Sequence, residues 1–162
     1  GLAVQYNADS RVKELYTSFP GLLESIEQKL HCVLRDECGR FVPQSLAKKI
    51  FSDRQALEIV ESLVFPALVE DFRGFAQGFG DGIVVFESAT ILEKPQFDGF
   101  GDKVILVDAP LEVRLERACQ RDNADREAVK ARMSNQKLMN AISEGETDFR
   151  IDAVIINDEP ER

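Results

Sequence analysis

Residues 103–136 read KVILVDAPLEVRLERACQRDNADREAVKARMSNQ, and this stretch decides the fold class of the chain. An apolar strand leads through Asp-Ala-Pro, residues 108–110, into a helix. The helix carries Arg114, Arg117 and Arg121 at positions i, i+3 and i+7, so the three side chains share one face. Like charges this close destabilise a helix by about 0.2–0.5 kcal/mol per pair. We therefore expect this face to bind an external anion, and phosphate is an anion that guanidinium groups hold in bidentate geometry.

A second interpretation treats the same helix face as a solvated surface. Arg121 would then pair with Asp125, one turn later. Exposed ion pairs of this kind typically contribute less than about 1 kcal/mol, and they need no ligand to explain them. The sequence alone leaves both interpretations open.

The overall charge of the chain limits its partners. Among the 162 residues, 29 are acidic and 20 are Lys or Arg, which gives a net charge of −9. A strongly acidic protein repels nucleic acid and anionic membranes, so we predict neither as a partner. A small polyanion held by a local arginine cluster is compatible with this charge.

Cysteine usage and the absence of long apolar runs predict a cytoplasmic protein. The three cysteines, Cys32, Cys38 and Cys119, and the one histidine, His31, suit neither a disulfide framework nor a zinc site. We therefore predict reduced thiols and no metal held by protein side chains alone. No apolar run of about 18 residues and no signal-peptide pattern is visible, so we expect no membrane segment.

Strand and helix patterns alternate along the chain, which predicts an α/β fold with a parallel sheet. The predicted strands cover 2–6, 83–86, 104–107 and 153–156. The predicted helices cover 11–16, 22–34, 44–51, 53–65, 67–75, 111–121 and 125–139, with a cap at Ser52 or Asp53. The continuous apolar runs at 83–86 and 104–107 are typical of strands that are buried on both faces.

Two segments are predicted to be connections. GFAQGFGDG, residues 74–82, is rich in glycine, and we interpret it as a loop between a helix and a strand. It does not match a phosphate cradle, because no strand precedes it and no Gly-Lys-Ser/Thr follows it. A tighter turn is predicted at Asp36–Arg40, around Gly39.

Polar residues follow the predicted strands. They are Asp9, Glu87, Asp108 and Asn157. The carboxyl ends of parallel strands meet at one edge of a sheet, where α/β proteins bind their ligands. We therefore expect the functional site at this edge.

Seven segments, taken in order, resemble the dephospho-coenzyme A kinase family of the P-loop nucleotide-kinase superfamily. They are VQYNADSRVKELY (4–16), GRFVPQSLAKKIFSD (39–53), ALEIVESLVFPALVEDF (56–72), IVVFESATILE (83–93), DKVILVDAPLEVRLERACQRD (102–122), ARMSNQ (131–136) and DAVIINDE (152–159). The resemblance implies a parallel-sheet P-loop kinase-like core with a helical acceptor-side subdomain and a helical lid, in one domain, 1–162. The implied subregions are core at 1–16, 81–111 and 146–162, acceptor side at 17–80 and lid at 112–145.

The resemblance implies an activity. Members of the family transfer the γ-phosphoryl group of ATP to the 3′-hydroxyl of dephospho-CoA, which gives CoA and ADP in the last step of coenzyme A biosynthesis. Such a transfer depends mainly on positioning and on charge neutralisation, with Mg²⁺ bridging the phosphates. ATP and dephospho-CoA are therefore the expected partners, and Mg²⁺ is the expected cofactor.

The resemblance also implies roles for single residues. Asp9 matches the carboxylate that orients the acceptor hydroxyl and accepts its proton, although an aspartate at this position could instead cap a helix. Arg117, Arg121 and Arg132 match lid arginines that close on the ATP phosphates. A surface ion pair is the alternative for Arg132. Arg114 matches no lid position.

Three more residues take implied roles at the strand ends. Asn157 matches a residue beside the adenine, and turn formation is its alternative. Glu87 and Glu93 match the acceptor side of the cleft, in an element where the family more often has a proline at the position of Ala89.

The chain departs from the family pattern elsewhere too. The family often has Asp-Ala-Asp where this chain has Asn7-Ala8-Asp9, so the catalytic acid is kept and the first acid is lost. It often has His-Pro where this chain has Phe65-Pro66, so any polar role of the histidine is lost.

The sequence contains no Gly-x-x-x-x-Gly-Lys-Ser/Thr loop, the motif whose backbone N–H groups and lysine bind the nucleotide phosphates. It begins where the second strand of the family begins, so we expect it to be a fragment that has no kinase activity by itself. Two alternatives remain: a P-loop kinase for another small metabolite, and a kinase-like domain that acts as a non-catalytic binding module.

Overall fold

The structure is a computed structural model that describes residues 3–94, 97, 99–134, 141 and 150–158. The chain divides into two compact units, Gly1–Ala89 and Thr90–Arg162. Each unit contains one pair of parallel strands and helices of its own, which confirms the predicted α/β class.

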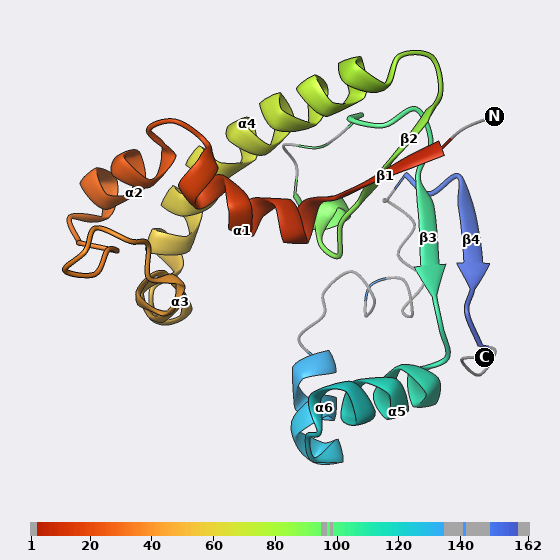
Figure 1. Cartoon of the computed structure of the whole chain (residues 1–162). Helices are drawn as coiled ribbons and strands as arrows, with labels where there is room; N and C mark the ends of the chain where they lie inside the picture. The colour runs from red at the N-terminus through yellow and green to blue at the C-terminus, as the bar shows by residue number, and fades with distance from the viewer. Residues whose placement is uncertain (1–2, 95–96, 98, 135–140, 142–149, 159–162) are drawn as a thin grey trace. The chain divides into compact units, whose positions relative to one another are not determined.

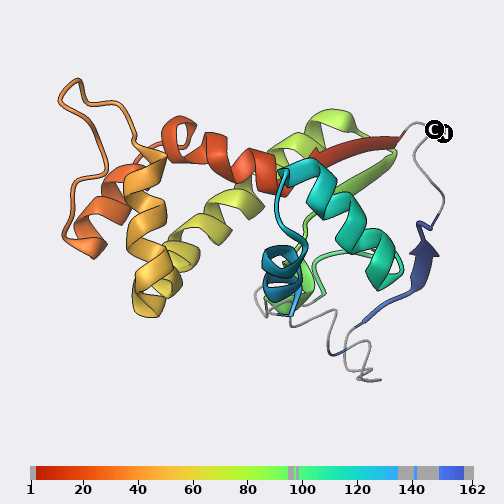
Figure 2. The same cartoon turned by 90° about the horizontal axis from the view of Figure 1, so that it is seen from below.

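The first unit joins two parallel strands to a group of four helices. Its elements are β1 (Ala3–Asn7), α1 (Ala8–Ser18), α2 (Leu22–Leu30), α3 (Pro43–Ser52), α4 (Arg54–Phe79) and β2 (Ile83–Glu87) (Figure 1). The strands pair in register from Ala3 opposite Ile83 to Asn7 opposite Glu87. Helix α4 packs against α1, α2 and α3, as Figure 2 shows from below.

The core of this unit is a helical stripe on α4 that faces the other helices. The buried residues of α4 are Ala56, Val60, Val64, Ala67 and Leu68, which recur at the spacing of one helix face. Leu15 of α1, Ile26 of α2 and Leu46 of α3 are buried as well. Burial of one such side chain stabilises the fold by about 1.5–3 kcal/mol.

Helix α4 is much longer than the sequence predicts. Asp53 caps it, as predicted, and accepts hydrogen bonds from the N–H groups of Gln55 and Ala56. The helix then continues through Pro66 and through most of the predicted loop 74–82, so that only Gly80–Gly82 connects it to β2. The predicted loop is therefore wrong for residues 74–79, because packing of the helix outweighs the cost of its two glycines, about 1 kcal/mol each.

An aromatic cluster with an ion pair fixes the end of α4 to β1. The Tyr6 ring lies 5.1 Å from that of Phe72 and 5.3 Å from that of Phe75, between ring centroids. The Tyr6 hydroxyl donates to Asp71 over 2.6 Å, and Arg11 donates to both oxygens of the same carboxylate over 2.7 Å. The Arg11 guanidinium lowers the pKa of Asp71, and burial is the main cause that raises the pKa of Tyr6.

Helix α2 is shorter than predicted, since it ends at Leu30 with His31 in the left-handed conformation at φ 49°. The predicted turn at Asp36–Arg40 is confirmed: Arg35 and Phe41 form an antiparallel bridge around it, and Gly39 has a φ of 77°. A left-handed φ of this kind favours glycine.

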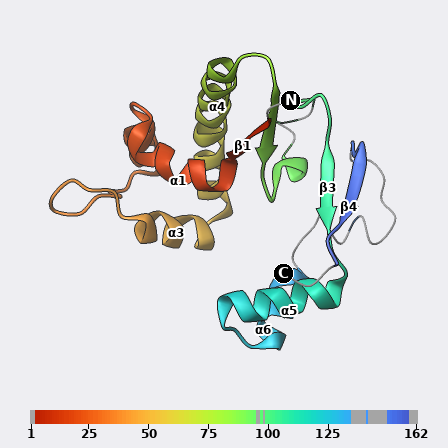
Figure 3. The same ribbon diagram turned by 45° about the vertical axis from the view of Figure 1, so that its right-hand side comes forward.

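The second unit contains a parallel strand pair and a helical hairpin. Its elements are η1 (Ile91–Glu93), β3 (Ile105–Asp108), α5 (Leu111–Asp122), α6 (Arg126–Met133) and β4 (Ala153–Ile156). Figure 3 shows β3 and β4 side by side, with α5 following β3. Leu115 and Val129 are the buried contacts of the hairpin, whereas Leu111 is half exposed. Residues 135–139 of the predicted second helix lie outside the described residues.

The strands are less buried than their apolar sequences predict. Ile83 in β2 is 66% exposed and Val107 in β3 is 60% exposed. Each strand belongs to a two-stranded sheet, and along β2 and β3 the more covered residues alternate with exposed ones. The prediction of strands covered on both faces is therefore wrong for the described residues. Among the described residues, no helix is both long enough and apolar enough to cross a bilayer.

Candidate active site

The carboxyl ends of β1 and β2 bring together Asp9 and Glu87, which the sequence marked as strand-end residues, and Asn7. Asn7 and Glu87 are register partners, and the Asn7 side-chain amide donates to the Glu87 carboxylate over 2.8 Å. The Gln5 amide donates to the same oxygen of Glu87. Asp9 stands next to them in the first turn of α1, and its carboxylate accepts from the backbone N–H of Ala89 over 3.4 Å.

Helix α1 is capped by Asn7, which corrects the alternative in which Asp9 is the cap. The Asn7 Oδ1 atom accepts from the Ser10 N–H over 2.9 Å, and Asn7 has the extended backbone of an N-cap residue. Asp9 is thus exposed at a helix N-terminus without a capping role. A carboxylate is favoured there by the helix dipole.

The carboxyl ends of β3 and β4 bring together Asp108, Asn157 and Arg117. The Asn157 N–H donates to the Asp108 carbonyl oxygen over 2.7 Å. Arg117 of α5 donates to the carbonyl oxygen of Asn157 over 3.0 Å and to its side-chain oxygen over 3.4 Å. Arg117 and Asn157, which are 40 positions apart and were predicted separately as site residues, are therefore neighbours.

The three arginines of α5 do not share one environment. Arg114 donates through Nε to the Ala109 carbonyl oxygen over 2.9 Å and lies 3.7 Å from the Asp108 carboxylate. It therefore ties the start of the helix to the end of β3. The role of Arg117 and Arg121 in binding phosphate stays a prediction.

Arg121 and Arg132 meet at Asp122, the last residue of α5. The Asp122 carboxylate accepts from Arg121 over 2.8 Å and 3.3 Å, and from Arg132 over 2.6 Å. These two guanidinium groups lower the pKa of Asp122 to about 2. The predicted pairing of Arg121 with Asp125 is wrong, because the Asp125 side chain instead caps α6.

Glu93 lies in the short helix η1, where its N–H donates to the Thr90 carbonyl oxygen over 3.0 Å. Its role on the acceptor side stays a prediction. All three cysteines are free thiols, and Cys119 is half-buried on α5.

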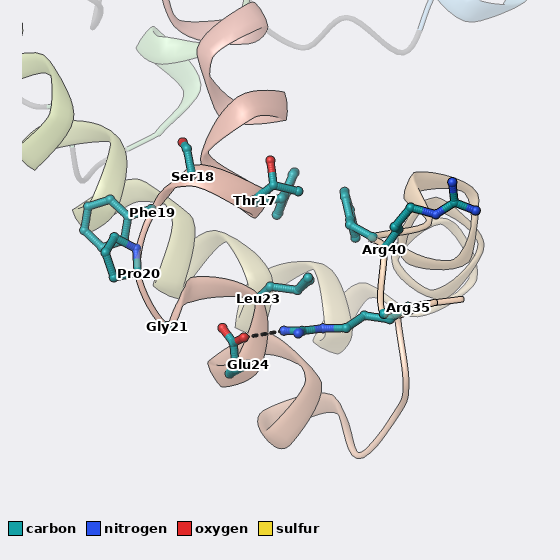
Figure 4. A pocket seen from close by; sticks show the side chains of 12 residues that line it. Thr17, Ser18, Phe19, Pro20, Gly21, Leu23, Glu24, Arg35 and Arg40 are labelled. Carbon is teal, nitrogen blue, oxygen red and sulfur yellow. Dashed lines mark hydrogen bonds and ion pairs between the residues drawn. The ribbon is translucent and has the colours of Figure 1, made fainter. Parts of the chain in front are cut away.

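A pocket of about 500 Å³ lies in the first unit, at the end of α1 opposite Asp9 (Figure 4). It is lined by Tyr16, Thr17, Ser18, Phe19, Pro20, Gly21, Leu23, Glu24, Arg35, Gly39, Arg40 and Phe41. Its cations are already paired, since Arg35 contacts Glu24 and Glu27 and Arg40 contacts Asp36. The pocket contains none of the predicted site residues.

Each unit thus carries polar side chains at the carboxyl ends of parallel strands, which is where α/β proteins, nucleotide-dependent phosphotransferases among them, bind their ligands. Comparison with known proteins narrows this class. The family model described as dephospho-CoA kinase matches residues 5–160. The chain belongs to the dephospho-CoA kinase family.

Individual relatives agree with this assignment. The dephospho-CoA kinase of Porphyromonas gingivalis is 30% identical over 146 residues, which cover 90% of this chain and 71% of that protein. That of Bartonella henselae is 30% identical over 155 residues, which cover 94% and 76%. The solved structure of dephospho-CoA kinase from Campylobacter jejuni superposes with a TM-score of 0.60 over 96% of this chain and 76% of that one, at 21% identity, which supports the fold.

Proposed function

We propose that the protein containing this chain transfers the γ-phosphoryl group of ATP to the 3′-hydroxyl of dephospho-CoA, which yields CoA and ADP. Family membership over residues 5–160 supports this proposal. The main supporting observation concerns the start of α1. Asn7 caps this helix, so the Asp9 carboxylate is exposed and is not used as the cap.

Asp9 acts as the residue that orients the attacking hydroxyl and accepts its proton. The Ala89 N–H holds one carboxylate oxygen, at 3.4 Å, and fixes the direction of the side chain. The other oxygen is then available to the 3′-hydroxyl. A positioned base of this kind typically contributes 10²–10⁴-fold to the rate.

The arginines of the second unit neutralise the phosphates of ATP. Arg117, Arg121 and Arg132 supply local positive charge in a chain whose net charge is −9. Asn157 lies beside the adenine and positions Arg117 through two hydrogen bonds. Glu87 and Glu93 form part of the acceptor side, and regions 17–80 and 112–145 serve as the acceptor-side subdomain and the lid.

Mg²⁺ fits this arrangement as an ion held mainly by the nucleotide. The described residues contain no group of three or more His, Cys, Asp or Glu side chains placed to share a metal ion. In phosphoryl-transfer sites, Mg²⁺ typically takes one or two carboxylates together with substrate phosphates and water. The ion would neutralise charge on the β- and γ-phosphates.

A coupled assay of ADP release tests the proposal with the full-length protein, which is expected to act in the cytoplasm. Turnover of ATP should require dephospho-CoA, and the product should be CoA. Equal turnover with shikimate, a nucleoside or a nucleoside monophosphate would assign the protein to another small-metabolite kinase. ATP binding without turnover of any acceptor would assign it to the binding modules.

A further inference from the structure

The turn between α5 and α6 places one carboxylate between two guanidinium groups. Asp122 accepts from Nε and Nη2 of Arg121 and from Nη2 of Arg132. The Asp122 side chain is 24% exposed, whereas those of Arg121 and Arg132 are 75% and 61% exposed. The acid is therefore the covered centre of the cluster, and the two arginines are its exposed rim.

Helix energetics do not explain an aspartate at this position. Asp122 is the last residue of α5, where the partial negative charge of the helix end disfavours a carboxylate. The turn itself is formed by other residues: Asn123 adopts the left-handed conformation, and Asp125 caps α6. Asp122 is thus not needed to end one helix or to start the next.

The cluster keeps a positive charge after pairing. One carboxylate faces two guanidinium groups, so the three side chains carry a net charge of +1. Within the described part of the chain, neither Arg121 nor Arg132 has another ion-pair partner. Both contact the same Oδ2 atom, which holds the two groups within the span of a single phosphate.

We propose that Asp122 is a positioning residue that holds Arg121 and Arg132 side by side for the phosphates of a nucleoside triphosphate. The inference rests on the proposed function only for the identity of the ligand. Since a guanidinium is planar and binds through fixed edges, the edges turned toward Asp122 determine which edges remain for the phosphate. In the paired state, the two arginine side chains have already lost their rotamer entropy. Without Asp122 they would lose it when the phosphate binds, which would weaken binding.

The direction in which Asp122→Asn changes the affinity for an anion distinguishes a positioning role from a purely electrostatic one. Asp122→Asn removes a negative charge next to an anion site, so charge alone would tighten the binding of an anion. Loss of positioning would weaken it. We expect the Kd of inorganic tripolyphosphate and the KM for ATP of the full-length protein to rise about tenfold, which is the effect of losing one charge-assisted hydrogen bond. The KM for dephospho-CoA should stay unchanged.

Two variants serve as controls for this experiment. Asp122→Glu keeps the charge and should recover most of the tripolyphosphate affinity. Glu116→Gln removes an exposed acid from the same helix, one whose carboxylate accepts from the Gln120 side chain, and should leave the affinity unchanged or slightly tighter. A melting temperature measured for each variant separates loss of fold from loss of positioning, and Asp122→Ser, which also removes the carboxylate, replaces Asp122→Asn if that variant unfolds.

Tripolyphosphate binding that is unchanged or tighter in Asp122→Asn would overturn the positioning role. The tripolyphosphate measurement does not depend on the acceptor, so it stands even if the protein phosphorylates another metabolite. Conversely, a protein without activity on dephospho-CoA whose Asp122→Asn variant still loses tripolyphosphate affinity would overturn the proposed function and support the role of Asp122.

Discussion

Asn7 donates its side-chain amide to the Glu87 carboxylate over 2.8 Å, across the carboxyl ends of β1 and β2. The same side chain accepts from the Ser10 N–H, so it acts as donor and acceptor at once. An aspartate at this position could cap the helix but could not donate to Glu87. The asparagine therefore links the cap of α1 to the end of β2.

Asn7→Asp should destabilise the protein. Asp and Asn cap helices equally well, so the variant keeps the cap, removes the hydrogen bond to Glu87 and adds repulsion between two carboxylates. We expect a loss of about 0.5–1 kcal/mol in the free energy of unfolding, because the pair is exposed. Urea unfolding measures it. Adding Glu87→Gln should restore stability, and an equal loss in the double variant would contradict the explanation.

Asp9→Asn should remove activity and leave stability intact. Because Asp9 does not cap α1, we expect kcat to fall by about 10²–10⁴-fold with little change in the KM for ATP or in the melting temperature. Asn7→Ala is the matched control, since loss of the cap should cost about 1 kcal/mol of stability. A normal kcat with a lowered melting temperature in Asp9→Asn would assign Asp9 a structural role instead.

The arginines of α5 should separate into two groups. Arg117→Ala and Arg121→Ala should raise the KM for ATP without unfolding the protein. Arg114→Ala should instead lower stability, by about 1 kcal/mol, because its guanidinium binds the Ala109 carbonyl oxygen and lies near Asp108. Steady-state kinetics and thermal unfolding of the three variants measure both effects. If the ATP kinetics of all three variants were unchanged, the arginine face of α5 would be a solvated surface and not a phosphate-binding one.

Local patterns predicted the elements whose signals lie within a few residues. The turn at Asp36–Arg40, the cap at Asp53 and helix α5 were predicted close to their observed positions. The length of α4 was not predictable in this way. Its glycines and Pro66 are local helix breakers, and the packing of Phe72 and Phe75 on Tyr6 outweighs them only in the folded unit.

The same distinction applies to the candidate site. The rule that ligands bind at the carboxyl ends of parallel strands pointed to Asp9, Glu87, Asp108 and Asn157, because it depends only on where a strand stops. The bonds that hold these residues were not visible, since the partner of Asn157 lies 40 positions away. Asp122 lies in the segment 102–122 that carries the family resemblance, but its contact with Arg132 was not predictable, because the two residues meet only through the turn that joins α5 to α6.

The tyrosines allow a test of the packing between β1 and α4. Burial, together with the hydrogen bond to Asp71, raises the pKa of Tyr6 above its ordinary value near 10. Burial is also the main cause that raises the pKa of Tyr16. A phenol with a raised folded pKa stabilises the fold fully below the unfolded pKa, and this stability is lost as the pH rises beyond it. Alkaline unfolding should therefore coincide with ionisation of these residues.

The absorbance of tyrosinate at about 295 nm, followed against pH together with circular dichroism, measures this coupling. The difference between the full-length protein and its Tyr6→Phe variant isolates Tyr6, which should stay protonated until the fold is lost. Asp71→Asn should lower the pKa of Tyr6 without returning it to 10, because burial, the largest cause, remains. Ionisation of Tyr6 near pH 10 in a protein that keeps its circular dichroism would show that the ring is not buried against α4.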